Sequence, residues 1–138
     1  MQLILAGILM TLICLTTEST IAAEPTHRDL EYARVGEHRL LLDLYLPTQT
    51  SEPVPLVVWI HGGAWRAGSK DSVPVERWLQ QGFAIASVEY RLSPVARFPA
   101  QIHDIKAAIR WLRGNSKTYG LDSDRFVIAG SSAGGHLA

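Results

Sequence analysis

Three apolar runs without polar alternation stand out along the chain. They cover residues 56–60, 83–88 and 126–129. Apolar runs of this kind are typical of strands that are covered on both faces, as in a parallel sheet. We therefore predict three strands of a largely parallel sheet.

Two segments with helical patterns lie between these runs. Residues 74–81 predict a short helix and residues 99–113 a longer one, which begins at Pro99 and ends near Gly114. The longer segment carries one apolar stripe at helical spacing. The stripe consists of Ile102, Ile105, Ile109 and Leu112. Strands and helices that alternate in this way predict an α/β sheet with right-handed crossovers.

An antiparallel hairpin is predicted ahead of the first apolar run. Residues 30–35 and 39–46 are extended segments on either side of Gly36 and Glu37, which form the turn. The predicted fold class is therefore α/β, with an N-terminal antiparallel hairpin that leads into a mostly parallel sheet with crossover helices.

The chain begins with an apolar segment over residues 3–15. The segment is shorter than the about 20 residues that span a bilayer, and small residues follow it, as in a signal peptide. We predict a signal peptide over residues 1–23, cleaved after Ala23 or, as second choice, after Ala22. The rival interpretation is a short buried helix. A signal peptide implies a secreted or periplasmic protein with no stable membrane anchor, whose folded part is residues 24–138.

Composition narrows the function classes. The chain has 13 basic and 13 acidic side chains and no basic run, which argues against a nucleic-acid partner. Its one cysteine excludes an internal disulfide and a cysteine-rich zinc site. The scattered histidines His27, His38 and His103 suggest no metal site, and nothing in the sequence implies a cofactor.

A G-x-S-x-G motif directly follows the last apolar run. It consists of Gly130, Ser131, Ser132, Ala133 and Gly134. A sharp turn from strand into helix would place Ser132 at its apex and expose the hydroxyl as a nucleophile. The two outer glycines would let strand and helix approach closely, because they lack Cβ atoms. The alternative is a glycine-rich loop that matches the motif by chance.

A second glycine motif follows the first apolar run and reads His61, Gly62, Gly63, Ala64, Trp65. It resembles the HGG-type turn of lipases and esterases, whose main-chain N–H groups bind an oxyanion. We predict that the N–H groups of Gly63, Ala64 and Ala133 are the donors. His61 is expected to brace the turn, supported by Gly62, and Trp65 either forms a pocket wall or packs.

These motifs belong to four longer stretches that carry a family resemblance. They read VVWIHGGAWRAGSKD, GFAIASVEYRLSP, FPAQIHDIKAAIRWLR and RFVIAGSSAGGHLA. Together they resemble the N-terminal half of an α/β-hydrolase of the lipase/esterase group related to hormone-sensitive lipase. The most similar branch is that of bacterial ferulic-acid-esterase-like carbohydrate esterases, and Ser131, where many relatives have Asp, favours it.

The resemblance implies a Ser-His-acid mechanism in which Ser132 forms an acyl-enzyme. It implies a substrate that is an acyl ester of a carbohydrate or of a small alcohol. In this fold the acid and the histidine follow the serine along the chain, whereas the sequence ends at Ala138. We therefore expect the parent protein to be a secreted serine esterase and this chain, truncated after the nucleophile turn, to be inactive, either as a biological fragment or as an incomplete sequence.

Two other functions remain open: a non-catalytic binding protein with this fold, and a serine peptidase. The sequence leaves the oligomeric state open as well. Among the remaining residues, Arg91 and Asp104 are predicted to pair beneath the active-site loops, and His136 is predicted to be a packing residue. The charges at Lys70 and Asp71, and those over residues 122–125, are expected to be solvated and to lie in turns.

Overall fold

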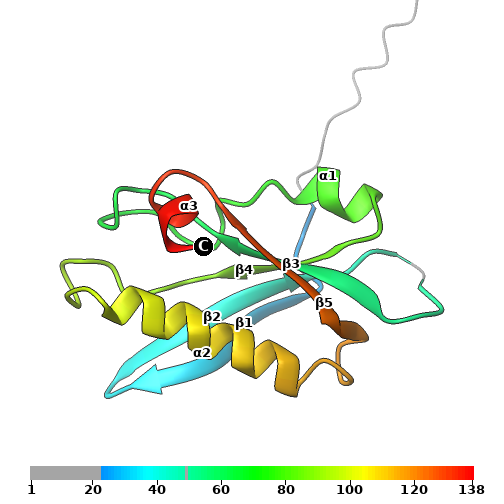
Figure 1. The fold of residues 1–138 in the computed structure, drawn as a ribbon, viewed down its shortest axis with the longest axis horizontal. Coiled ribbons are helices and arrows are strands. Elements are labelled where there is room, and N and C mark those ends of the chain that lie inside the picture. The colour runs from blue at the N-terminus through cyan, green and yellow to red at the C-terminus, as the bar shows by residue number, and fades with distance from the viewer. Residues whose placement is uncertain (1–22, 49) are drawn as a thin grey trace, which may run out of the picture.

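The computed structural model describes residues 23–48 and 50–138, which form one five-stranded mixed sheet with helices on both faces (Figure 1). The strands are β1 (His27–Val35), β2 (His38–Tyr45), β3 (Val54–Ile60), β4 (Ala84–Val88) and β5 (Leu121–Gly130). The helices are α1 (Val75–Gln80), α2 (Ala100–Gly114) and α3 (Ala133–Leu137). Residues 1–22 of the predicted signal peptide lie outside the described residues.

The sheet has the order β1-β2-β4-β3-β5 and changes from antiparallel to parallel at β4. β1 and β2 form the predicted hairpin, and β2 pairs antiparallel with β4. β3 pairs in parallel with both β4 and β5. The predicted fold class is confirmed.

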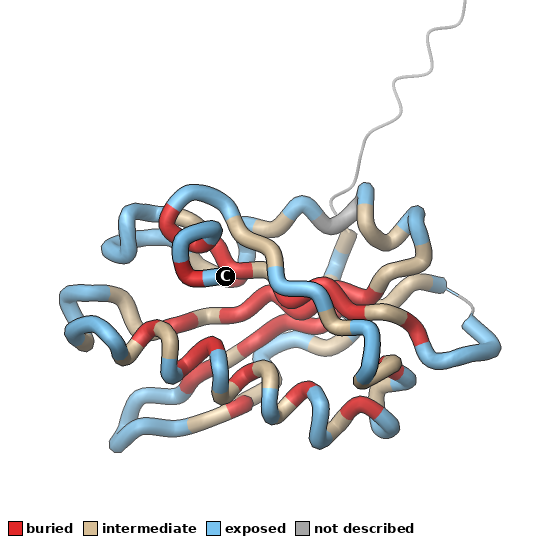
Figure 2. The backbone as a smooth tube through the Cα atoms, in the orientation of Figure 1, coloured by how far each residue is buried: buried red, intermediate tan, exposed pale blue. Residues whose placement is uncertain are grey.

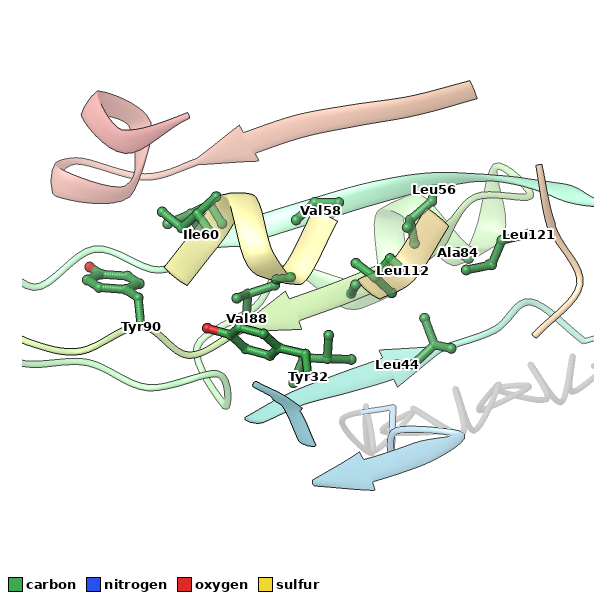
Figure 3. Close-up of a cluster of buried hydrophobic side chains, with 14 of the residues drawn as sticks. Tyr32, Leu44, Leu56, Val58, Ile60, Ala84, Val88, Tyr90, Leu112 and Leu121 are labelled. Atoms are coloured by element: carbon green, nitrogen blue, oxygen red, sulfur yellow. The ribbon is translucent and has the colours of Figure 1, made fainter. Parts of the chain in front are cut away.

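The long helix α2 covers one face of the sheet and α1 covers the other. Figure 3 shows Leu112 of α2 among the buried side chains of Leu44, Leu56 and Val58. The predicted apolar stripe faces this core: Ile105 and Leu112 are buried, and Ile102 and Ile109 pack against it. On the opposite face, Trp78 and Leu79 of α1 pack against Tyr45, Val57 and Ile85. The central strands are buried along most of their length (Figure 2).

The structure corrects the expectation for residues 122–125. They belong to β5, which begins at Leu121 and not at residue 126. Leu121 pairs with Val54, and a register shift separates this pair from the next one, Leu56 with Phe126. Polar residues therefore sit inside the strand at an irregularity, where their side chains stay partly exposed and Asp122 pairs with Arg125.

Candidate active site

The two glycine motifs lie side by side at one edge of the sheet. They follow the carboxyl ends of the neighbouring parallel strands β3 and β5, where Ile60 is opposite Gly130. The Ser131 N–H donates to the carbonyl of Ile60 (3.3 Å), and a Cβ atom placed on Gly62 would lie 3.4 Å from Ser132 Cβ. The carboxyl ends of parallel strands are the edge at which open α/β sheets bind ligands.

Ser132 occupies a strained turn between β5 and α3. Its backbone has φ 50° and ψ −118°, outside the regions that L-residues ordinarily adopt, and the residue is exposed. The Gly134 N–H donates to Ser131 O (2.8 Å) and the His136 N–H to Ser132 O (3.1 Å). The predicted strand–turn–helix conformation around this serine is present.

The close approach predicted for the flanking glycines is also present. A Cβ atom on Gly130 would lie 2.4 Å from the carbonyl carbon of Gly134, and one on Gly134 would lie 2.1 Å from the carbonyl oxygen of Ile60. Real Cβ contacts are never this short, so any larger residue would push the turn away from β3. These two glycines set the position of the serine relative to the sheet.

The turn after β3 has an unusual backbone conformation. Gly63, Ala64 and Trp65 have positive φ angles of 116°, 52° and 61°. The carbonyl of Gly63 accepts hydrogen bonds from the N–H groups of Arg66 (2.9 Å) and Ala67 (3.0 Å). In a trans peptide the next N–H points opposite to the carbonyl, so these bonds aim the Ala64 N–H away from the loop interior.

The three predicted oxyanion donors have no backbone hydrogen-bond partner in the part of the chain that the structure describes. Within residues 23–48 and 50–138, the N–H groups of Gly63, Ala64 and Ala133 have no backbone acceptor outside regular secondary structure. Ala133 is the first residue of α3, where an N–H has no partner within the helix. Their role as oxyanion donors stays a prediction, and this geometry supports it.

His61 lies beneath the turn and not in the open site. Its residue is 1% exposed, and its ring stacks on Tyr90 with centroids 4.5 Å apart. Nδ1 lies 2.7 Å from the carbonyl oxygen of Gly62, so Nδ1 must carry the proton, because a carbonyl only accepts. The Tyr90 hydroxyl donates to the His61 carbonyl (3.0 Å). Burial lowers the pKa of His61 and keeps the ring neutral near pH 7. These contacts support the predicted bracing role.

A pocket of about 340 Å³ opens beside the turn. Its walls include Ala64, Trp65, Phe98 and His136. Trp65 therefore lines a pocket, one of its two predicted positions. His136 packs as predicted, with its ring and that of Trp65 in a T-shaped contact at a centroid distance of 5.5 Å, but it is exposed and belongs to the pocket wall. Phe98, which is 72% exposed and precedes Pro99, was not predicted to lie at the site.

The predicted pair of Arg91 and Asp104 is confirmed. The guanidinium donates to both carboxylate oxygens, from Nε at 2.9 Å and from Nη2 at 2.7 Å, and the Arg91 N–H adds a third bond at 3.0 Å. The Gln101 side-chain amide donates to the carbonyls of Arg91 (2.9 Å) and Ala96 (2.8 Å). These bonds fasten the segment after β4 to α2, and that segment reaches the pocket at Phe98.

The expectation that Lys70 is solvated is wrong. The residue is 6% exposed, and its ammonium group lies 2.9 Å from carboxylate oxygens of both Asp29 and Asp43. Burial lowers the pKa of Lys70, but the bonds and charges of the two carboxylates outweigh this effect and raise it. The neighbouring Asp71 is exposed, as expected.

The described ranges offer neither a metal centre nor a membrane span. In residues 23–48 and 50–138 there is no group of three His, Cys, Asp or Glu side chains placed to hold a metal ion. No helix in the same ranges is both long enough and apolar enough to span a bilayer.

The mixed sheet, the strained serine turn and the adjacent glycine turn together define an α/β-hydrolase. Residues 42–138 match the family model described as BD-FAE, and the chain belongs to that family. The family resemblance found in the sequence is thereby confirmed.

The relatives are esterases. The chain is 38% identical to esterase LipC of Mycobacterium tuberculosis over 105 residues, which cover 71% of this chain and 25% of LipC. It is 36% identical to the ethyl acetate hydrolase of Pseudomonas putida, over 80% of this chain and 36% of that enzyme. The chain thus spans between a quarter and just over a third of the length of these two relatives.

Solved structures of similar fold support membership of this family. A bifunctional GH43-CE protein of Bacteroides eggerthii superposes with a TM-score of 0.72 and 42% identity, over 80% of this chain and 16% of that one. Est2, a thermophilic esterase of Thermogutta terrifontis, superposes with a TM-score of 0.75 and 28% identity, over 82% of this chain and 42% of Est2.

Proposed function

We propose that the protein containing this chain is a serine carboxylic-ester hydrolase with Ser132 as its nucleophile. The observation that carries the proposal is the exposed Ser132 at φ 50°, next to the glycine turn that follows β3. A positive φ at a serine is costly, and strain of this kind collects at functional sites. The esterase relatives support the same reaction class.

In the proposed reaction, Ser132 Oγ attacks the carbonyl carbon of an ester while a histidine takes its proton. The oxyanion of the tetrahedral intermediate accepts hydrogen bonds from the N–H groups of Gly63, Ala64 and Ala133. The intermediate collapses, and the alcohol leaves with the proton from the histidine. Water then attacks the acyl-enzyme in the same way, which releases the carboxylic acid and restores the serine.

The proposed mechanism needs a histidine and an acid from the rest of the full-length protein. His61 is buried with its Nδ1 bound to Gly62, and the ring of His136 lies against Trp65. No histidine of the described ranges hydrogen bonds to Ser132 Oγ. We therefore expect the 138-residue chain by itself to be inactive.

For the substrate we propose an acyl ester of a carbohydrate or of a small alcohol. The aromatic side chains of Trp65 and Phe98 in the pocket suit a sugar ring or an apolar acyl group. One protein of similar structure is a carbohydrate esterase from gut microbiota, solved in a truncated form. We further propose that the protein is exported, because residues 1–23 have the pattern of a signal peptide. A mature protein that begins at Glu24 in the medium or periplasm would support this proposal. An uncleaved cytoplasmic protein would oppose it.

The test compares the full-length protein with its Ser132→Ala and Ser131→Ala variants on p-nitrophenyl acetate and on short peptides. We expect ester hydrolysis to fall at least about 10³-fold in Ser132→Ala, because an enzyme without its nucleophile keeps only residual catalysis. The neighbouring Ser131→Ala should retain activity. Peptide cleavage without ester cleavage would favour the peptidase, and no turnover of either substrate would favour the binding protein.

A further inference from the structure

We propose that Lys70 is a positioning residue that holds the oxyanion turn in place through a cluster of charges, in which Lys70 and Asp43 are buried and Asp29 is 52% exposed. The cluster, called here the Lys70 clamp, consists of Lys70, Asp43, Asp29 and Ser87. The inference rests on the proposed function, because it assigns the clamp a role in the same reaction. None of the four side chains belongs to the nucleophile turn or to the pocket beside it.

The clamp fixes Lys70 at both its side chain and its main chain. Nζ lies 2.9 Å from Asp43 Oδ2 and 2.9 Å from Asp29 Oδ1. The Ser87 hydroxyl donates to the Lys70 carbonyl at 2.6 Å. Asp43 in β2 and Ser87 in β4 are both 0% exposed and face each other across paired strands. Lys70 is thus bound to the rigid centre of the sheet.

The carboxylate of Asp43 is itself fully engaged. Its Oδ1 accepts the N–H of Asp29 at 2.7 Å, and Asp29 reaches this position with a positive φ of 56°. Arg28 Nη1 lies 3.7 Å from Oδ2, so two cations face the two carboxylates. The bond to Lys70 also lowers the pKa of Asp29, which keeps that carboxylate charged. The ammonium group of Lys70 is therefore matched by acceptors that are themselves held in place.

The chain just before Lys70 packs directly under the oxyanion turn. A Cβ atom on Gly68, whose φ is 97°, would lie 2.4 Å from His61 Nδ1 and 2.5 Å from the Gly62 carbonyl oxygen. A Cβ atom on Gly63 would lie 2.0 Å from the carbonyl oxygen of Ala67. The turn therefore rests on residues 67–68, and these residues are held by Lys70 two positions further on.

Stability alone does not account for a charged cluster here. A buried ion pair is often no more stabilising than an apolar pair of the same volume, because desolvating the charges offsets their attraction. A charged cluster differs from an apolar pair because its hydrogen bonds are directional. It therefore holds the segment that ends at Lys70 in one conformation. The N–H groups of Arg66 and Ala67 donate to the Gly63 carbonyl, which lies in the same peptide plane as the Ala64 N–H. The conformation of this segment therefore sets the direction of the Ala64 N–H.

The expected consequence of releasing the clamp is a loss of kcat. Oxyanion donors act on the charge that develops in the transition state, so a misplaced donor lowers kcat and leaves KM nearly unchanged. A displacement of about 1 Å in an active site can reduce the rate about 10²-fold. For Lys70→Met, which keeps the apolar stem and removes the charge, we expect kcat to fall at least about tenfold and KM to stay within about twofold.

The experiment uses the full-length protein with p-nitrophenyl acetate, and an alkylboronic acid as an analogue of the tetrahedral intermediate. Two variants release the clamp: Lys70→Met, and Ser87→Ala, which removes only the bond to the Lys70 carbonyl. Because Ser87→Ala removes only one hydroxyl group, we expect this variant to fold even if Lys70→Met does not. Arg125→Met is the matched control, because it breaks an exposed ion pair at the far end of β5. All variants are assayed well below their melting temperatures.

Support for the clamp is a lower kcat in Ser87→Ala, and in Lys70→Met where it folds, with a boronic-acid Ki that rises by about the same factor as kcat/KM falls. Folded clamp variants with kcat within twofold of the parent, and an unchanged Ki, would overturn the proposal, even if their melting temperatures were lower. Ser132→Ala separates the two hypotheses: full activity in that variant refutes the proposed function, whereas its inactivity beside active clamp variants refutes only the clamp.

Discussion

Replacing Arg91 with methionine should destabilise the protein strongly. Asp104 has a side chain that is 3% exposed, against 16% for Arg91. The substitution removes two charge-assisted hydrogen bonds, at 2.9 Å and 2.7 Å, and leaves the carboxylate only the Arg91 N–H at 3.0 Å. Methionine keeps most of the apolar stem, so the loss is mainly that of the guanidinium. Breaking a buried ion pair costs about 3–5 kcal/mol, and we expect the free energy of unfolding to fall by this amount.

The assay is urea denaturation of the full-length protein at pH 7, followed by tryptophan fluorescence. The matched control is Arg125→Met, which removes the same group from a pair whose side chains are 58% and 27% exposed. Solvent screens that pair, so its loss, together with the exposed bond from Arg125 to the Pro53 carbonyl, should cost only about 1 kcal/mol. Equal losses in the two variants would refute the argument that burial, and not the ion pair itself, sets the magnitude.

Three further predictions concern the site. Gly134→Ala should cost more than about 3 kcal/mol or prevent folding, because its Cβ would lie 2.1 Å from a backbone oxygen of Ile60. Gly114 has open space around it, so Gly114→Ala should be neutral or stabilising by up to about 1 kcal/mol in the same denaturation assay. Burial lowers the pKa of His61 below 6.5, so on acidification the unfolded chain binds this proton before the folded chain does, and the free energy of unfolding falls as the pH drops through 6.5. Between about pH 7.5 and 5.5, His61→Gln should therefore lose less stability than the parent. Trp65→Ala should raise KM for aromatic esters more than for acetate esters, and equal changes in steady-state kinetics would remove this side chain from the pocket wall.

The fold was largely predictable because its signals are local. Continuous apolar runs mark buried parallel strands, and the stripe on α2 marks the face that packs on the sheet. The start of β5 was not predictable: its first residues are polar and pair with β3 only across a register shift, which apolar patterning does not reveal. Strand order likewise depends on long-range pairing that no single segment encodes.

The glycine motifs were predictable because their backbone geometry permits few residue types. The Lys70 clamp was missed because its partners lie 27 and 41 residues earlier in the chain. One signal was present: Asp43 stands alone inside an apolar strand segment, and a carboxylate buried there requires a cation. His136 was assigned to packing from the resemblance, but α3 turns its ring outward to Trp65.

The central claim is that Ser132 is the nucleophile of an ester hydrolase. The most direct measurement is to treat the full-length protein with a fluorophosphonate, digest it, and locate the modified residue by mass spectrometry. We expect one phosphonylated serine, Ser132, with loss of ester hydrolysis in proportion to labelling and no labelling of Ser132→Ala. Modification of Ser131 or another residue, or an active enzyme that the reagent leaves unlabelled, would contradict it.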